Sequence, residues 1–209
     1  MVIVFLGPPA SGKGTQARKL AEKLNLKYLS TGDMLRDIKE ARKDIAKLIT
    51  EGKLVPDKVF LKLLLEYFEG KKIYDNLVLD GSPRSVFQYE KIKDWLESKG
   101  SKIDRAIFLD ISQETAVKRI SSRREDRYTG EVYNLITNPP GPEIDKKNLI
   151  IRDDDRPQVV KERFEVYKNE TKPLVTRFKK EGILLQVDGE QPINIIFSEI
   201  LAKIGIKND

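Results

Sequence analysis

A glycine-rich stretch near the start of the chain has residue types that bind phosphate. Residues 7–16 read GPPASGKGTQ, with Lys13 between Gly12 and Gly14 and with Thr15 next. Glycines let the backbone curl closely around phosphate oxygens, so that N–H groups and a helix N-terminus face the anion. Lysine adds a mobile charge for the terminal phosphates, and the threonine hydroxyl suits a magnesium ion. The stretch departs from the strict P-loop pattern because Gly14 precedes the hydroxyl residue.

A carboxylate at the end of an apolar run is the second candidate. Residues 77–80 read LVLD and end in Asp80, and the turn that follows ends in Arg84. A strand that delivers a carboxylate beside a turn and an arginine is the arrangement expected for holding a magnesium-bound water and a phosphate. Asp110 ends the similar run IFLD and competes for this role. We prefer Asp80 because an arginine follows it closely.

Arginines gather in two later segments, which contain Arg119, Arg123, Arg124 and Arg127, and Arg152, Arg156 and Arg163. The spacing of four between Arg119 and Arg123 predicts that they share one face of a helix, where two forked charges suit phosphate oxygens. The alternative is a solvated face paired with the aspartates at 153–155. Between the two groups, residues 127–151 contain NPPGP and few helix signals, which predicts an inserted lid.

The elements that position these residues alternate between short apolar runs and amphipathic segments. Val2 to Leu6, directly before the glycine stretch, predicts a strand that is buried on both faces. The alternation predicts an α/β fold, with a five-stranded parallel sheet and helices on both of its faces. Ligands of such folds bind at the carboxyl ends of the strands. The predicted strands are 2–6, 27–29, 76–80, 105–110 and 183–187, and the predicted helices are 13–24, 33–50, 57–69, 85–98, 112–123, 156–181 and 192–204.

The composition limits the chemistry and the kinds of partner. The chain has 209 residues, of which 39% are hydrophobic, and this suits one globular core with small insertions. It has no cysteine and no histidine, which excludes thiol nucleophiles, disulfides and imidazole bases. The net charge of +6 favours anionic partners. The apolar run near the start is too short to cross a bilayer, and we expect a cytoplasmic protein.

Taken together, the motifs resemble the adenylate kinase family in its long-lid form, and the resemblance extends along the whole chain. One such motif is weak evidence, whereas this series in this order is specific. The motifs are GPPASGKGTQ at 7–16, STGDMLR at 30–36, GKLVPD at 52–57, LDGSPRS at 79–85, Gln88, the arginine set at 119–124, GEVYN at 130–134, NPP at 138–140 and RDDDRPQVVKER at 152–163.

The resemblance implies a phosphotransferase that moves the γ-phosphoryl group of magnesium-bound ATP to AMP, reversibly giving two ADP, and so serves adenine nucleotide homeostasis. Phosphoryl transfer mainly requires that the two nucleotides are aligned and that the charge of the transferred group is neutralised. A chain without histidine can therefore perform it. The implied catalytic residues are Lys13, Arg84, Arg123, Arg152 and Arg163, and the implied magnesium site is at Thr15 and Asp80. The implied ATP contacts are Ala10, Ser11, Gly12, Lys13, Gly14, Thr15, Arg119, Arg123, Val132, Tyr133 and Gln191. The implied AMP contacts are Thr31, Arg36, Lys53, Leu54, Val55, Gly81, Ser82, Pro83, Arg84, Gln88, Arg152 and Arg163.

The resemblance also divides the chain into a core and two inserted mobile lobes. The AMP-binding lobe would span 30–55 and the lid 122–155, and their closure would keep water from the γ-phosphate. The remaining segments, which would form the core P-loop domain, are 1–29, 56–121 and 156–209.

The lid departs from the form that many family members have, because they bind zinc there through cysteines. This chain has none, so we expect no zinc and a lid held by packing and polar pairs, involving Asp126, Thr129, Tyr133 and residues near Asp145. Two further departures are Ser82, where the family usually has phenylalanine, and Asp153, where a basic residue is common.

Two other functions compete with this interpretation. The nearer is another nucleoside monophosphate kinase with a UMP or CMP acceptor or a GTP donor, although Thr31 and Gln88 favour adenine at the acceptor. The remoter is a regulatory or nucleic-acid-binding P-loop protein, but the chain has no N-K-x-D sequence and no basic stripe with interleaved aromatics. We therefore expect ATP, AMP and ADP as partners, neither nucleic acid nor membrane, and a monomer, which is usual in the family.

Overall fold

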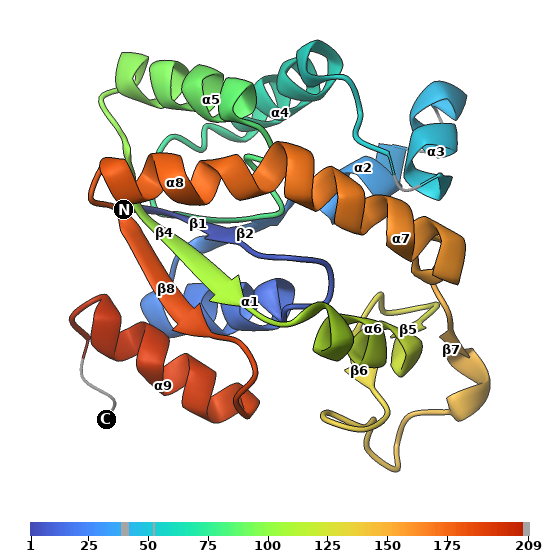
Figure 1. Cartoon of the computed structure of the whole chain (residues 1–209). Coiled ribbons are helices and arrows are strands. Elements are labelled where there is room, and N and C mark those ends of the chain that lie inside the picture. The colour runs from blue at the N-terminus through green and yellow to red at the C-terminus, as the bar shows by residue number, and fades with distance from the viewer. Residues whose placement is uncertain (39–41, 52, 207–209) are drawn as a thin grey trace.

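The computed structural model describes residues 1–38, 42–51 and 53–206, and its centre is a five-stranded parallel sheet (Figure 1). The strand order is β2-β3-β1-β4-β8. β1 lies in the middle, and its five residues are apolar and buried, because helices cover both faces of the sheet. The prediction of this sheet is confirmed. The strands are β1 (Val2–Leu6), β2 (Lys27–Ser30), β3 (Leu77–Asp80), β4 (Ile103–Asp110) and β8 (Leu184–Asp188).

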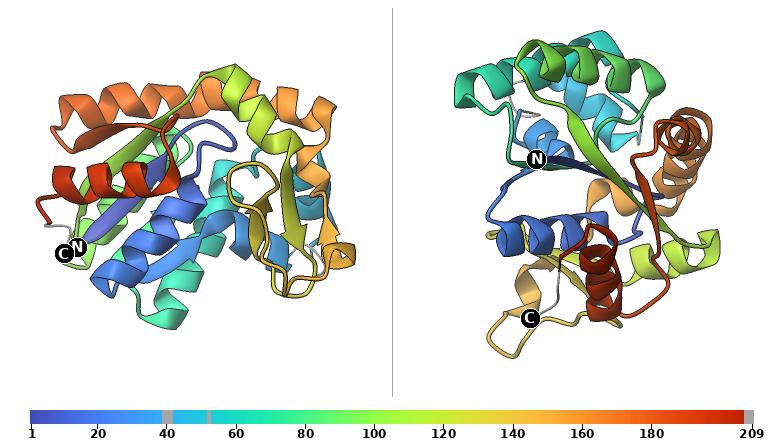
Figure 2. Two further views of the ribbon diagram at one scale, coloured as in Figure 1. Left: turned by 90° about the horizontal axis from the view of Figure 1, so that it is seen from below. Right: turned by 90° about the vertical axis from the view of Figure 1, so that its left-hand side faces the viewer.

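One or more helices follow each of these strands along the described part of the chain. They include α1 (Lys13–Leu24), α2 (Thr31–Ile38), α3 (Lys43–Thr50), α4 (Asp57–Lys71), α5 (Val86–Ser98), α6 (Gln113–Ser121), α7 (Pro157–Val166), α8 (Lys172–Lys180) and α9 (Ile193–Lys203). Figure 2 shows the resulting layers, with the sheet between α1 and α9 on one side and α4, α5 and α8 on the other.

The side chains of each strand explain why both faces are covered. Ile3 of β1 packs in a cluster with Leu20 of α1 and Ile200 of α9. Val4, whose side chain points to the opposite face, packs in a second cluster with Phe68 of α4 and Phe178 of α8 among others. All six of these side chains are essentially withdrawn from solvent. Two apolar clusters therefore hold the sheet rigidly and fix the positions of its strand ends.

Two predicted helices are interrupted. The prediction at 33–50 covers α2 and α3, and residues 39–41 between them lie outside the described residues. The prediction at 156–181 covers α7, a π-helical segment (Tyr167–Thr171) and α8. Pro173 lies in the first turn of α8, directly after the π-helical segment, and it has no N–H to donate to the preceding turn, which fits a change of helical pitch there.

The lid segment, residues 122–155, contains a small antiparallel sheet that the sequence did not predict. Its strands are β5 (Arg123–Asp126), β6 (Val132–Asn134) and β7 (Leu149–Ile150), in the order β6-β5-β7. The lid segment also contains two 3₁₀ turns, η1 (Lys146–Asn148) and η2 (Asp153–Asp155). This sheet is separate from the large one (Figure 1), but the predicted boundaries of core, lid and AMP-binding lobe stay a prediction.

Candidate active site

The glycine-rich loop between β1 and α1 depends on backbone shapes that only glycine adopts easily. Gly7 has φ +149°, and a Cβ atom there would lie 2.5 Å from the carbonyl oxygen of Leu109. Gly12, with φ +92°, is the N-cap of α1. The N-terminus of α1 lines the cavity, and the first N–H groups of a helix have no partner within it. These N–H groups can therefore bind an anion in the cavity.

Lys13 bends back over this loop. Its Nζ donates hydrogen bonds to the carbonyl oxygens of Gly7 at 2.9 Å and of Pro8 at 2.8 Å. Desolvation lowers the pKa of Lys13 from 10.5 to about 7; Asp80 opposes this shift, and Arg84 is among the arginines that add to it. A phosphate bound there would place negative charge beside the buried ammonium group and offset the cost of its desolvation. The site therefore favours an anion at Lys13.

Asp80 ends β3 within the reach of the loop. The hydroxyl of Tyr28 donates to its Oδ2 at 3.2 Å, and a Cβ atom on Gly14 would lie 3.1 Å from the same oxygen. Burial raises the pKa of Asp80, and Lys13 opposes that shift. The competing Asp110 is exposed and does not line the cavity, and its Oδ2 accepts a hydrogen bond from Gln186 at 3.1 Å. The geometry therefore favours Asp80 over Asp110 as the carboxylate of the site.

The turn after β3 and the start of α2 bring a second group of polar residues to the cavity. Thr31 begins α2 and donates through Oγ1 to the carbonyl of Asp80 at 3.1 Å. Arg84 donates from Nε to the carbonyl of Gly81 at 2.7 Å, and burial lowers its pKa. Arg36, on the second turn of α2, is ion-paired with Asp33. These cations suit a second anionic group near the first.

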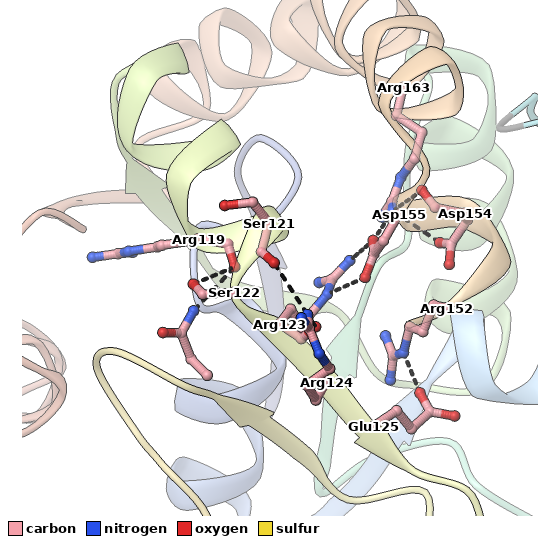
Figure 3. A network of polar contacts seen from close by, with 11 residues as sticks. Arg119, Ser121, Ser122, Arg123, Arg124, Glu125, Arg152, Asp154, Asp155 and Arg163 are labelled. Atoms are coloured by element: carbon pink, nitrogen blue, oxygen red, sulfur yellow. Dashed lines mark hydrogen bonds and ion pairs between the residues drawn. The ribbon is translucent and has the colours of Figure 1, made fainter. Parts of the chain in front are cut away.

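Arginines and aspartates form a network between the lid segment and α7 (Figure 3). Arg123 and Arg163 converge on Asp155, with a 2.7 Å contact from Nε of Arg123 and a 3.2 Å contact from Nη1 of Arg163. Arg163 also contacts Asp154 at 2.8 Å, and Arg152 pairs with Glu125. The arginines therefore pair with the aspartates at 153–155, as the alternative prediction has it. The pairs of Arg123 and Arg163, however, are largely buried rather than solvated.

The network has electrostatic consequences for its members. Desolvation lowers the pKa of Arg163 to about 10, although Asp154 opposes the shift. Burial alone would raise the pKa of Asp154, but the surrounding arginines, Arg163 first among them, hold it below its usual value. The network pairs three arginines with three carboxylates, so a phosphate would bind there by replacing a carboxylate as the partner of a guanidinium.

The prediction that Arg119 and Arg123 share a helix face is wrong. α6 ends at Ser121, where the hydroxyl of Ser122 donates to the carbonyl of Lys118 at 3.0 Å, and Arg123 is the first residue of β5. Side-chain bonds of this kind compete with the helical backbone and help end the helix. Arg119 instead donates to the carbonyl of Gly189 at 2.8 Å, so the two arginines occupy different parts of the site.

A single cavity of about 970 Å³ joins these groups. Every predicted site residue except Ser82 lines it: Ala10, Ser11, Gly12, Lys13, Gly14, Thr15, Thr31, Arg36, Lys53, Leu54, Val55, Asp80, Gly81, Pro83, Arg84, Gln88, Arg119, Arg123, Val132, Tyr133, Arg152, Arg163 and Gln191. The side chain of Ser82 is fully buried outside the lining, and its Oγ has no hydrogen-bond partner among the described residues.

Two polar residues of the lining, Tyr28 and Asp154, are among those that the sequence did not single out. Tyr28 holds the carboxylate of Asp80, and Asp154 places a negative charge among the arginines. Tyr28 could have been found from its place in β2, since parallel pairing sets Tyr28 opposite Val78, two residues before Asp80 and on the same face of the sheet. Nothing in the run of three aspartates, by contrast, distinguishes Asp154 from Asp153, which lies outside the lining.

Polar contacts hold the lid segment together, as expected for a lid without cysteines. Oδ1 of Asp126 accepts hydrogen bonds from the backbone N–H groups of Tyr128 at 2.8 Å and Thr129 at 2.9 Å. Tyr133 donates to Glu131 at 2.9 Å, and this hydrogen bond raises the pKa of Tyr133 to about 12. Further along, the carboxylate of Asp145 accepts from the N–H of Lys147 at 3.0 Å and caps η1. These hydrogen-bonded turns therefore order the lid segment locally.

The fold and the site together define a class of protein. A glycine loop between a central parallel strand and a helix, a strand-end carboxylate, and arginines on both sides of one cavity are the parts of a P-loop phosphotransferase. Among the helices that the structure describes, none has the length and apolar character needed to cross a membrane.

Comparisons with known proteins identify the family within this class. The family model described as adenylate kinase matches residues 5–183. Proteins named adenylate kinase are 40% identical in Archaeoglobus fulgidus, with 97% of both chains covered, and 37% identical in Thermotoga neapolitana, with 97% of this chain and 96% of the relative covered. A further one, from Shouchella clausii, is 35% identical with 99% of both chains covered. The chain belongs to the adenylate kinase family, and it is a phosphotransferase.

Proposed function

We propose that this chain transfers the γ-phosphoryl group of ATP to AMP and that the two nucleotides occupy opposite halves of the single cavity. The observation that carries the proposal is the position of Lys13, which lies over the glycine loop in the cavity that is also lined by Asp80, Arg84, Arg123 and Arg163. Phosphoryl transfer needs its cations around the group in flight, between donor and acceptor. Lys13 has this central place.

On the donor side, the glycine loop would bind the phosphates of ATP through backbone N–H groups and Lys13. Arg119 would contact the donor base, because its guanidinium reaches the carbonyl of Gly189 near Gln191. Val132 and Tyr133 would cover the base from the lid segment. The proposed donor contacts are Ala10, Ser11, Gly12, Lys13, Gly14, Thr15, Arg119, Arg123, Val132, Tyr133 and Gln191.

On the acceptor side, Arg36 and Arg84 would bind the phosphate of AMP, and Gln88 would contact its base. Arg152 and Arg163 would approach the transferred group from the lid side. Both of these arginines have acidic partners in the structure, so binding would exchange a carboxylate for a phosphate as the ligand of each guanidinium. The proposed acceptor contacts are Thr31, Arg36, Lys53, Leu54, Val55, Gly81, Pro83, Arg84, Gln88, Arg152 and Arg163.

The oxygen ligands near the loop fit the magnesium ion that accompanies ATP in this family. Thr15 and Asp80 offer a hydroxyl and a carboxylate, and magnesium prefers one or two such groups together with water and phosphate oxygens. The described residues contain no cluster of three or more acidic, histidine or cysteine side chains that would form a complete protein cage. When bound with ATP, magnesium supplies positive charge to the β- and γ-phosphates. Thr15 and Asp80 would hold it in place.

The inserted segments 30–55 and 122–155 would move as lobes and close over the nucleotides, which keeps water from the reacting phosphate. We further propose that the enzyme is a monomer, as is usual in the family.

A coupled assay with MgATP and each nucleoside monophosphate tests the proposal. We expect fast ADP formation with AMP and little with UMP or CMP, and faster turnover with ATP than with GTP. Lys13→Ala and Arg84→Ala should each lower kcat by about 100-fold or more, with the fold intact, whereas the surface change Lys62→Ala should not. Fast turnover with UMP and none with AMP would contradict the adenylate assignment, and near-normal rates in Lys13→Ala would contradict the role of the loop.

A further inference from the structure

The side-chain amide of Gln88 is held at both of its ends. Gln88 lies in the first turn of α5, lines the cavity and is 2% exposed. Its Oε1 accepts a hydrogen bond from the backbone N–H of Arg84 at 2.8 Å, and its Nε2 donates to Oδ1 of Asp57 at 2.8 Å. Asp57 begins α4, so the contact joins the N-terminal ends of two helices.

These two partners allow only one orientation of the amide. A backbone N–H can only donate and an ionised carboxylate can only accept, so Oε1 must face Arg84 and Nε2 must face Asp57. Turning the amide by half a rotation would set its N–H groups against a donor and its oxygen against a carboxylate. Two hydrogen bonds would be replaced by two repulsive contacts in a buried place.

Asp57 is the stronger of the two anchors and is itself held in place. Its second oxygen, Oδ2, accepts a hydrogen bond from the hydroxyl of Ser85 at 2.8 Å. Ser85 is the N-cap of α5 and accepts from the backbone N–H of Gln88 at 3.1 Å, as in a capping box. The contact of Gln88 with Asp57 is charge-assisted, whereas that with Arg84 is between neutral groups, so Asp57 contributes more to the fixed orientation.

We infer that Asp57 is a positioning residue that fixes the amide of Gln88 and thereby lets the acceptor pocket select adenine over a 6-oxopurine. The inference rests on the proposed function, in which Gln88 contacts the base of the monophosphate. With its two anchors occupied, the amide still has one N–H and one oxygen lone pair to offer. Their order in space is fixed by Asp57.

Adenine and hypoxanthine present opposite patterns to such an amide. Adenine has an acceptor at N1 beside a donor amino group at C6, whereas hypoxanthine has a donor at N1 beside an acceptor oxygen. An amide that is free to turn satisfies either pattern, and one that is held satisfies a single pattern. When the polar groups of a site are fixed, they stay without hydrogen-bond partners if the wrong base binds. The free-energy cost of these unpaired groups rejects that base.

The test compares kcat/KM for AMP with that for inosine monophosphate in the wild type and in the variants Asp57→Asn and Asp57→Ala. The first replaces the charged acceptor with an amide that can donate as well as accept, and the second removes the anchor. We expect the AMP preference to fall by about tenfold or more, mainly through a higher KM for AMP. Glu66→Gln, which also removes a charge from α4 where Glu66 faces Lys62, should leave the preference unchanged.

A second measurement does not depend on turnover. In the nucleotide-free protein labelled with ¹⁵N, the two Nε2 protons of Gln88 should give separate, shifted signals that move toward ordinary amide positions in both Asp57 variants. Unmoved Gln88 signals, or a fall in activity with AMP and inosine monophosphate alike at an unchanged preference, would overturn the inference. Absence of AMP turnover in the wild type would instead overturn the proposed function and leave the NMR result as the test of the anchor.

Discussion

The guanidinium of Arg123 and the carboxylate of Asp155 form a two-pronged ion pair between the two ends of the lid segment. Arg123 begins β5, and Asp155 ends η2, with Arg156 as the N-cap of α7 directly after it. The Nε–Oδ2 distance is 2.7 Å, and the side chain of Asp155 is 1% exposed. Arg163 contacts the same carboxylate at 3.2 Å. One buried acid thus holds two arginines of the cavity and ties the lid segment to α7, the helix that follows it.

Removing that acid should destabilise the protein strongly. In Asp155→Asn, Arg123 and Arg163 would keep their charges in a buried place with a weaker partner, and breaking such a pair costs about 3 kcal/mol. We expect a fall of that size in the free energy of unfolding, measured by urea denaturation. Asp153→Asn is the matched control, because Asp153 pairs with Arg156 on the surface and such pairs contribute about 0.5 kcal/mol or less. Equal losses in the two variants would contradict the account of the network.

The lowered pKa of Lys13 should make stability depend on pH. Its pKa is about 7 in the folded protein and 10.5 ordinarily, so between these values the unfolded chain binds more protons than the folded one. The free energy of unfolding of the nucleotide-free protein should therefore rise from pH 7 to pH 9, by up to about 1.4 kcal/mol per pH unit from this group. Lys13→Met lacks this contribution. Denaturation curves with the same pH slope in wild type and Lys13→Met would contradict the prediction.

Two glycines should respond oppositely to alanine. In Gly7→Ala the new Cβ atom would lie 2.5 Å from the carbonyl of Leu109, at a φ of +149° that alanine rarely adopts, so we expect a loss of about 3 kcal/mol or more. Gly70 is in α4 with open space around it, and Gly70→Ala should raise stability by about 0.5 kcal/mol. Thermal denaturation measures both. A stable Gly7→Ala variant would show that the loop has another way to form.

Chelation should leave the nucleotide-free protein unchanged. The described residues provide no cluster of metal-binding side chains, and the lid segment is ordered by hydrogen bonds such as those of Asp126. Removing divalent metals with EDTA should therefore not shift the Tm measured by calorimetry. A drop of several degrees that zinc reverses would reveal a structural metal in the lid.

The large sheet and the glycine loop could be predicted from the sequence because their signals are local and agree. The first strand and helix lie where the apolar run and the spacing of three and four place them, at Val2–Leu6 and Lys13–Leu24. Their order with respect to the loop then specifies the parallel sheet, since the handedness of the crossovers leaves few alternatives. The strand ends then place Lys13, Asp80 and Arg84 around one cavity, whereas the other predicted contacts rested on the family resemblance.

The lid segment could not be predicted in the same way. β5 has the sequence RRED and β7 has two residues, so neither has the apolar alternation that indicates a strand. Arg123 has a spacing to Arg119 that fits a helix, yet it begins β5, because pairing with Asn134 of β6 and with Asp155 outweighs local preference. Such contacts join residues far apart in sequence, and no short window contains them.

Binding of a bisubstrate mimic, two adenosines joined end to end by a phosphate chain, tests the central claim most directly. Titration calorimetry should give one mimic per chain, and a crystal structure of the complex should place one adenosine beside Arg119 and the other beside Gln88, with the phosphates between Lys13, Arg84 and Arg123. A complex in which one half of the cavity stays empty, with Arg36 and Arg84 directed into solvent, would contradict the account.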